Sequence, residues 1–265
     1  MKLKLYLFGL VIGSLFLTGC APSKSFPSGK WIDLTYEFSF ETIYWPTSDT
    51  FQLKEVFEGT TDNGYYYTAN TFCTAEHGGT HIDAPIHFAK GRWTVEQIPL
   101  HHLTGKAVVI DVSGNALQNR DYQIGVDDFT NWEATHGRII EGTIVLLKTG
   151  LGQFWPDPAK YMGTAKRGQQ AVEDLHFPGL HPDAAQRLVD NRLIHAIGLD
   201  TPSIDYGQSE LYESHQILFD RNIPAFENVA NLDRLPPTGA WVIALPIKIK
   251  GGSGGPLRIV ALLPD

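Results

Sequence analysis

Short apolar runs recur through the C-terminal two thirds of the chain and predict buried strands. Most are rich in β-branched residues, and they are too short for buried helices, which need ten residues or more. Apolar runs without polar alternation are typical of strands that are covered on both faces. The predicted strands are residues 107–112, 142–148, 196–199, 240–245 and 257–263.

Two segments show the spacing of helices instead. Residues 126–136 carry Asp127 and Asp128 in the first turn and Gly137 just past the end, which suits a helix start and a C-terminal cap. Residues 182–191 repeat apolar side chains at three- and four-residue spacing. The mixture predicts one strand-rich α/β domain whose long loops hold the unusual residues.

Composition narrows the class of protein. The chain has 265 residues, of which 43% are hydrophobic and 19% charged, as in ordinary folded proteins, so disorder and a multi-span membrane protein are excluded. The net charge of -8 argues against nucleic acid as a partner. We find no repeat or long linker after residue 30, which favours a single folded unit.

The N-terminus has the pattern of a secretion signal. Lys2 precedes an apolar run over residues 5–17, which is shorter than the roughly 20 residues of a spanning helix. The run ends in Leu17-Thr18-Gly19-Cys20, which resembles the lipobox of bacterial lipoproteins and implies cleavage before a lipidated Cys20. A plain secretory signal with a chance cysteine is the alternative. Ala21 rather than Asp follows the cysteine, which by analogy favours the outer membrane, facing the periplasm.

These features divide the chain into three parts. The expected parts are a lipoprotein signal peptide (residues 1–19), a lipidated cysteine with a tether (20–30) and a single folded domain (31–265). Cys73 is then the single remaining thiol, so it forms no internal disulfide. We expect it to be a small buried side chain rather than a nucleophile.

Three histidines and an aspartate fall within residues 77–88. The glycine pair 78–79 and Pro85 disfavour a continuous helix there. If the segment from residue 81 is extended, its side chains alternate between two faces. His81, Asp83 and His87 then share one face.

A metal ion is the chemistry that this pattern favours. The glycine pair lets the chain turn, so His77 also reaches the shared point. Imidazole nitrogen and carboxylate oxygen suit Zn²⁺ or Mn²⁺, and a metal with an open position activates water near neutral pH. Hydrogen-bonded structural histidines are the alternative, which would suffice for one lone histidine. One segment supplies only part of a ligand set, and His215 and Glu227 are the best downstream candidates.

The residues resemble the cyclase family of metal-dependent hydrolases, which includes bacterial kynurenine formamidases and is related to isatin hydrolases. The resemblance covers roughly residues 31–263. It implies an α/β domain with a β-barrel-like core flanked by helices, and a homodimer or higher oligomer. The segments that carry it are residues 31–35, 77–88, 142–150, 177–180, 198–205, 227–237 and 251–258.

The resemblance also implies roles for individual residues. His87 matches the histidine that transfers protons, and Ser203 and Asp205 fall near the substrate, although a structural turn would explain those two as well. One or two ions of Zn²⁺ or Mn²⁺ are implied, with Asp83 bridging when two are bound. The implied metal ligands are His77, His81, Asp83, His215 and Glu227.

The implied activity is hydrolysis of an amide-type C–N bond by metal-activated water. The small-molecule substrate would be an N-formyl arylamine such as N-formylkynurenine or a cyclic amide such as isatin. Kynurenine formamidases are usually soluble cytoplasmic enzymes, so an envelope-tethered enzyme would meet a different amide, ester or lactam. Aromatic residues either line a pocket for a flat substrate or belong to the core. These are Trp45, Tyr65, Tyr66, Tyr67, Phe154 and Trp155.

Two other functions would require different features of the sequence. A non-catalytic metal- or solute-binding envelope lipoprotein would not need His87 beside a full ligand set, and the chain has no histidine-rich tract of the kind used for metal storage. A serine hydrolase would need a Gly-x-Ser-x-Gly turn that leads from a strand into a helix, whereas the glycine-rich segment around Ser253 (residues 251–255) lies beside a predicted terminal strand. We expect ordinary hydrogen-bonding or surface roles for most of the other histidines.

Overall fold

The computed structural model describes residues 28–265. The predicted signal peptide, the predicted lipidation at Cys20 and most of the predicted tether lie outside these residues and stay predictions. Among the described helices, none combines the length and the apolar character needed to cross a membrane.

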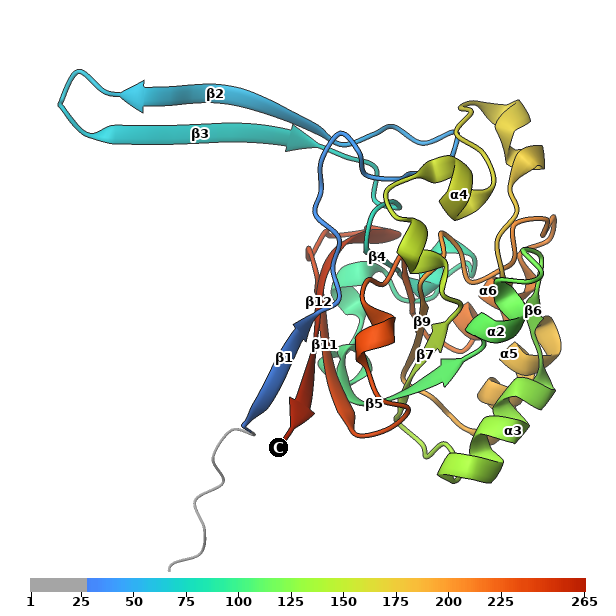
Figure 1. The fold of residues 1–265 in the computed structure, drawn as a ribbon. Coiled ribbons are helices and arrows are strands. Elements are labelled where there is room, and N and C mark those ends of the chain that lie inside the picture. The colour runs from blue at the N-terminus through green and yellow to red at the C-terminus, as the bar shows by residue number, and fades with distance from the viewer. Residues whose placement is uncertain (1–27) are drawn as a thin grey trace, which may run out of the picture.

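Within residues 28–265, seven strands close into a ring at the centre of the molecule, which confirms the predicted β-barrel-like core (Figure 1). In order around the ring they are β12 (Gly254–Pro264), β11 (Ala240–Pro246), β5 (Thr104–Asp111), β7 (Ile144–Lys148), β9 (Ala196–Leu199), β10 (Ala225–Glu227) and β4 (His81–Asp83). Pairing of β12 with β4 closes the ring. A further strand, β1 (Gly29–Asp33), pairs with β12 from the outside.

The strands are apolar on both faces because each face meets a different part of the core. In β7, Ile144 and Leu146 join an apolar cluster supplied by strands all around the ring. Val145 and Leu147 face a second cluster shared with the outer helices. All four side chains are fully buried. This two-sided burial explains the uninterrupted apolar runs from which the strands were predicted.

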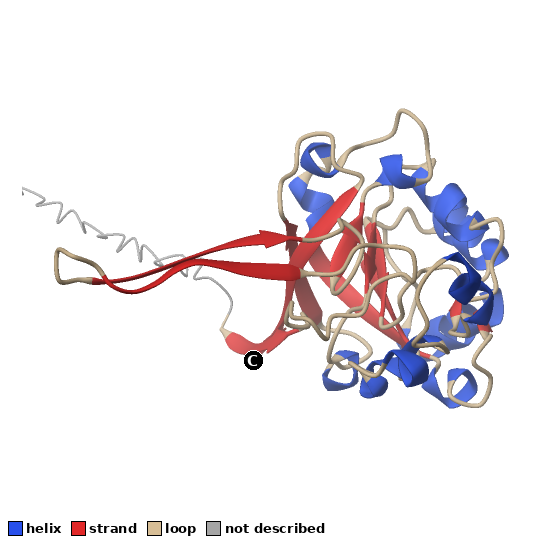
Figure 2. Cartoon of the chain, turned by 90° about the horizontal axis from the view of Figure 1, so that it is seen from above, coloured by secondary structure: helices blue, strands red, loops and turns tan. Residues whose placement is uncertain are grey.

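Helices cover the outside of the parallel strands β5, β7 and β9 (Figure 2). The helices α3 (Val126–His136) and α5 (Pro182–Asn191) have the predicted bounds, and α6 (Glu213–Phe219) packs beside α5. The remaining elements are short: α1 (Leu100–Leu103), α2 (Ser113–Ala116), α4 (Pro158–Met162), the pair β6 (Gln123–Ile124) and β8 (Gly179–Leu180), and the 3₁₀ turns η1 (Pro85–His87), η2 (Val95–Gln97), η3 (Leu151–Phe154), η4 (Gln169–Asp174) and η5 (Leu232–Arg234).

The segment after His81 is extended over a shorter stretch than we predicted. Strand β4 ends at Asp83, and the chain then turns into η1 with Pro85 at its first position. Proline favours this position because its fixed φ suits a helical turn and its missing N–H is not needed there. His87 therefore projects from a turn and not from the strand that carries His81.

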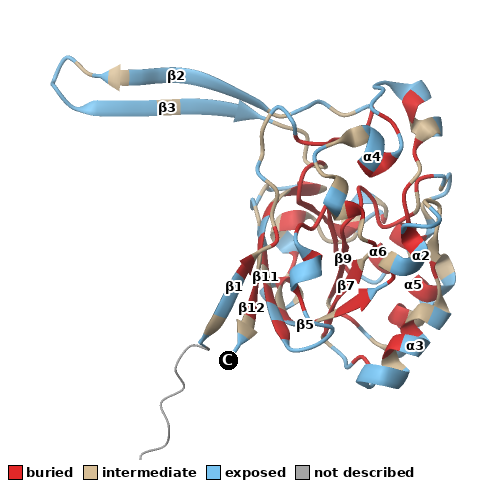
Figure 3. Ribbon diagram, in the orientation of Figure 1, coloured by how far each residue is buried: buried red, intermediate tan, exposed pale blue. Residues whose placement is uncertain are grey.

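A two-stranded hairpin extends far from the barrel, and the sequence analysis did not predict it. The hairpin arm consists of β2 (Gln52–Thr60) and β3 (Tyr66–Cys73) (Figure 1). Figure 3 shows it almost wholly exposed, in contrast to the barrel. Tyr65, Tyr66 and Tyr67 lie exposed at its tip, away from any pocket wall. Cys73 is exposed at its base, so the prediction of a buried thiol is wrong.

A cluster of three imidazole rings lies beside α1. The ring centroids of His101, His102 and His195 are 4.7 to 5.0 Å apart. His102 Nδ1–H donates to the carbonyl oxygen of His195 at 2.6 Å. This is the hydrogen-bonding role that we expected for these histidines. Burial lowers the pKa of His102 to about 4, against the hydrogen bond to His195, which raises it; the charges of the His195 and His101 rings lower it as well.

The cluster predicts a loss of stability in mild acid. The folded state holds His102 neutral down to about pH 4, whereas the unfolded chain protonates it near its ordinary pKa of 6.5. Between these values the unfolded chain binds more protons, so stability falls as the pH falls. We expect the Tm of the His102→Asn variant, which keeps a side-chain donor, to fall less than that of the wild type between pH 6.5 and pH 4. Parallel Tm curves for the two proteins would contradict this.

Candidate metal centre

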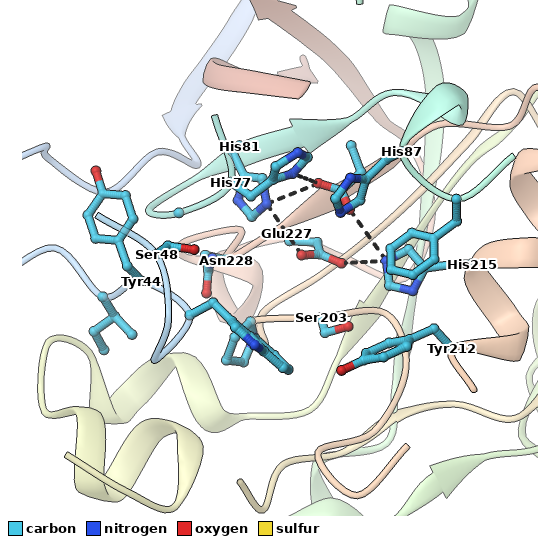
Figure 4. A pocket seen from close by; sticks show the side chains of 16 residues that line it. Tyr44, Ser48, His77, His81, His87, Ser203, Tyr212, His215, Glu227 and Asn228 are labelled. Atoms are coloured by element: carbon cyan, nitrogen blue, oxygen red, sulfur yellow. Dashed lines mark hydrogen bonds and ion pairs between the residues drawn. The ribbon is translucent and has the colours of Figure 1, made fainter. Parts of the chain in front are cut away.

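Four segments of the chain bring the five predicted ligands together (Figure 4). His81 and Asp83 lie on the same face of β4, and Glu227 at the end of β10 pairs directly opposite His81. His77 lies in the turn before β4, and His215 projects from α6. Four of these side chains are buried, and His77 is partly buried. The structure thus places all five predicted ligands around one point.

Asp83 stands between two groups of nitrogen atoms. Its Oδ1 is 2.7 Å from His77 Nδ1 and 3.1 Å from His81 Nε2. Its Oδ2 is 3.4 Å from His215 Nε2. Glu227 faces the same nitrogens, with distances of 3.2 Å to His215 Nε2 and 3.4 Å to His81 Nε2. The two oxygens of Asp83 thus face opposite halves of the site.

The outer nitrogens of the rings show which nitrogen carries the proton. His81 Nδ1 lies 3.0 Å from the carbonyl oxygen of Gly79, which accepts but does not donate. His215 Nδ1 lies 2.5 Å from Asp205 Oδ2 in the same way. In a neutral ring the inner Nε2 then carries a free lone pair. His81 Nε2 is buried and has no hydrogen-bond partner among the described residues.

This arrangement attracts positive charge. Burial alone would lower the pKa of His81, but Asp83 and Glu227 raise it to about 10. Burial likewise opposes the charged form of His215, and the carboxylates around it, Asp205 first, raise its pKa well above the ordinary value. Lone pairs and carboxylates that face one another in a buried site need positive charge between them, which protons supply in the metal-free site and a divalent ion can replace. The donor set therefore fits one or two divalent ions with nitrogen and oxygen ligands.

A network behind the site holds the double-glycine turn. Asn228 Nδ2 donates to the carbonyl oxygen of Gly79 at 2.7 Å, and Tyr161 Oη donates to Asn228 Oδ1 at 2.9 Å. Gly79 has a φ of +56°, and a Cβ on Gly78 would lie 2.0 Å from the Tyr44 ring. The turn therefore requires glycine at both positions. The sequence analysis missed Tyr161, because an isolated tyrosine carries no local signal of such a role.

A cavity of about 310 Å³ opens beside the ligands. Its walls are mainly apolar, and the buried Ser203 is part of its lining (Figure 4). Apolar side chains of the wall are Ile43, Tyr44, Trp45, Phe88, Pro202 and Tyr212.

Some of the side chains considered for the cavity have structural roles instead, the alternative that the sequence left open. Asp205 is absent from the described lining of the cavity, because its carboxylate accepts from the backbone N–H groups of Ser214 and His215 and from His215 Nδ1. It therefore orients His215 and does not face a substrate. Phe154 and Trp155 pack against a separate apolar cluster. Phe88 and Tyr212 are wall residues that the sequence analysis missed.

His87 lies at the mouth of the cavity beside the ligands. Its ring stacks on His77 with centroids 3.8 Å apart, and its Nε2 is 3.9 Å from Asp83 Oδ2, beyond hydrogen-bond distance. Burial lowers the pKa of His87 to about 4, so its imidazole is neutral near pH 7. His87 is the more exposed partner of the site, with a nitrogen available to a bound molecule.

Comparisons with known proteins agree with this geometry. Residues 32–206 match the family described as putative cyclase. The chain is 31% identical to the isatin hydrolase of Roseibium aggregatum over 210 residues, which cover 76% of this chain and 77% of the relative. It is 30% identical to the kynurenine formamidase of Salinibacter ruber over 233 residues, which cover 86% and 95% of the two chains.

Solved structures show the same fold. Isatin hydrolase A from Labrenzia aggregata, bound to benzyl benzoate, superimposes with a TM-score of 0.80 and 31% identity, and the match covers 89% of this chain and 94% of that one. An isatin hydrolase bound to the product analogue thioisatinate gives a TM-score of 0.79 with 28% identity, over 89% and 93% of the two chains. The chain therefore belongs to the cyclase family of metal-dependent hydrolases.

Proposed function

We propose that this protein uses a divalent metal to hydrolyse an amide-type C–N bond in a small, flat, aromatic substrate. The substrate class would be N-formyl arylamines or cyclic aryl amides. One observation carries the proposal: inward-facing imidazole nitrogens and two buried carboxylates meet at the floor of an aromatic-walled cavity. The names of the relatives, isatin hydrolase and kynurenine formamidase, support this chemical class.

The ligands form two groups that share Asp83. His77 and His81 face its Oδ1, whereas His215 faces its Oδ2 together with Glu227. Asp83 would therefore help to hold an ion in either group or in both. When bound, a divalent ion polarises a carbonyl group and lowers the pKa of water, which supplies a nucleophile at neutral pH.

The cavity walls would orient the substrate. Trp45 and Tyr212 contact each other with centroids 6.4 Å apart, and Phe88 lies 5.3 Å from Tyr212 and 4.5 Å from His215. Such aromatic walls bind a flat ring through its faces and edges. A ring held there directs its carbonyl group toward the carboxylates and imidazoles of the floor. The walls also limit the access of bulk water.

His87 would move the proton. Its neutral imidazole lies at the cavity mouth and is stacked on His77, so its orientation is fixed. It accepts the proton lost by the attacking water and returns it to the leaving nitrogen. Its distance of 3.9 Å from Asp83 leaves its Nε2 free for this transfer.

Replacement of His87 tests this role. We expect His87→Ala to keep normal metal content and to lose about 10²–10⁴-fold in kcat, which is the usual contribution of a general acid–base. The measurement is turnover of a panel of N-formyl arylamines and cyclic amides, with metal content determined on the same samples. Full turnover by a metal-replete variant would remove His87 from the scheme.

Removal of the metal tests the activity itself. We expect chelation to abolish hydrolysis and Zn²⁺ or Mn²⁺ to restore it, because the buried floor of the cavity lacks another electrophile among the described residues. His215→Ala should lower the number of ions bound per chain, and Cys73→Ser, at the base of the hairpin arm, serves as the control. Turnover that persists in metal-free protein would contradict the proposal. Metal binding without hydrolysis of any panel substrate would indicate a capture protein instead.

We also propose that the protein is a homo-oligomer and that the hairpin arm binds a second copy. Leu53, Val56 and Phe72 of the arm are more than half exposed. A two-stranded hairpin by itself is at best marginally stable in water, and exposed apolar patches usually mark interfaces. An extended arm with apolar side chains along its length is thus expected to be covered in solution.

The oligomer predicts a clear hydrodynamic result. We expect the wild type to sediment as a dimer or larger species, and Leu53→Thr combined with Val56→Thr to shift it toward monomer. Threonine keeps the strand propensity while removing apolar surface. Ile140→Thr, an exposed apolar position on the body of the protein, is the matched control. A wild type that stays monomeric at micromolar concentration would overturn this.

A further inference from the structure

Two side chains outside the ligand set are joined behind His77. Ser253 lies in the turn just before β12, and Glu76 immediately precedes His77. Ser253 Oγ is 2.6 Å from Glu76 Oε2, and the backbone N–H of Ser253 donates to the same oxygen at 3.0 Å. A carboxylate only accepts, so the single proton of the Ser253 hydroxyl is committed to Glu76.

This commitment decides the state of His77. Ser253 Oγ is also 2.9 Å from His77 Nε2, and with its own proton used it must accept from that nitrogen. The ring proton of a neutral His77 therefore lies on Nε2. Its Nδ1 then presents a lone pair to Asp83 Oδ1 at 2.7 Å, so a metal ion, or in the metal-free site a second ring proton, must lie between the two atoms.

We propose that Glu76 and Ser253 are positioning residues that hold His77 with Nδ1 toward the metal. The proposal rests on the metal centre proposed above. A ring turned by 180° about its Cβ–Cγ bond would place carbon where Nδ1 now faces Asp83. The hydrogen bond to Ser253 holds the ring against that turn, and the Glu76 carboxylate fixes the direction in which this bond is donated.

Packing restricts the position of the His77 ring but does not select one of its two orientations. A Cβ added to Gly254 would lie 2.6 Å from His77 Cε1, so the backbone passes close to the ring edge. His87 stacks on the ring with an interplanar angle of 19°. Neither contact distinguishes the two orientations of the His77 ring, because nitrogen and carbon have nearly the same size. The polar pair therefore supplies the selection.

Closure of the barrel puts Ser253 in place. Gly254 pairs with Asp83 where β12 meets β4, and the backbone N–H of Ala84 donates to the carbonyl oxygen of Ser253 at 2.8 Å. The same strand pairing that completes the ring thus sets the hydroxyl against His77. The outer nitrogens of His81 and His215 are held differently, by a backbone carbonyl group and by a carboxylate.

Zinc affinity and imidazole ¹⁵N chemical shifts test the inference without reference to turnover. In zinc-loaded wild type, His77 should show a protonated Nε2 and a metal-bound Nδ1. Ser253→Ala should weaken zinc binding about 10–100-fold in a chelator competition, the usual effect of losing a partner that orients a ligand. Ser253→Thr keeps the hydroxyl and should restore tight binding. A protonated Nδ1 in the zinc-loaded protein would overturn the assignment.

Glu76→Ala is a second, independent variant. It frees the Ser253 hydroxyl to donate to Nε2, which favours the wrong tautomer, so zinc affinity should again fall. The apparent Tm of each metal-free variant reports whether the barrel still folds. Unchanged zinc affinity in folded Ser253→Ala and Glu76→Ala proteins would refute the positioning role.

His81→Ala separates this inference from the metal centre itself. It removes a proposed ligand and should lose most zinc binding. If His81→Ala binds zinc as tightly as the wild type, the proposed centre is wrong. If His81→Ala loses zinc while Ser253→Ala keeps it, the centre stands and the positioning role fails.

Discussion

Two buried carboxylates that face the lone pairs of three imidazole rings are the constraint on which this structure depends. Asp83 and Glu227 lose their water on burial, and the rings beside them offer acceptors because their own protons point outward. Such a site is stable only when protons on the rings or a metal ion supply positive charge between these groups. The same feature that would destabilise an empty site gives it affinity for a divalent ion and the ability to activate water.

The closed barrel holds the ligands in place despite their unfavourable burial. Strand β4 is three residues long, yet it pairs with β10 on one side and β12 on the other. A slip of one residue in either pairing would turn His81 and Asp83 toward the apolar cluster that Ile82 now joins. Pairing on both edges fixes the register, and the Asn228 network fixes the turn that presents His77. The ligands are thus positioned by backbone geometry before any ion binds.

Recognition of the substrate is built from different parts of the chain. The floor of the cavity comes from barrel strands, the turn before β4 and α6, whereas Trp45, Phe88 and Tyr212 of the wall come from loops and turns. Loops can change without disturbing the barrel, so the walls of this cavity can vary while its floor stays the same. The hairpin arm extends away from the metal centre, so its proposed role in binding a second copy is separate from catalysis.

The sequence by itself determined the features that depend on neighbours along the chain. Two-sided apolar runs predicted the strands, helical spacing and caps predicted α3 and α5, and the dense histidine–aspartate segment predicted a metal site. His215 and Glu227 needed the family resemblance, because each is an isolated residue more than 120 positions from His81.

Tertiary structure alone decided the rest. It ended β4 at Asp83, exposed Cys73 on an arm, assigned Asp205 to His215 and brought Ser253 against His77 across the barrel seam. These outcomes depend on pairings between distant strands, whose register is set by packing around the whole ring. Local propensity and residue spacing cannot predict such contacts, because they depend only on neighbours along the chain.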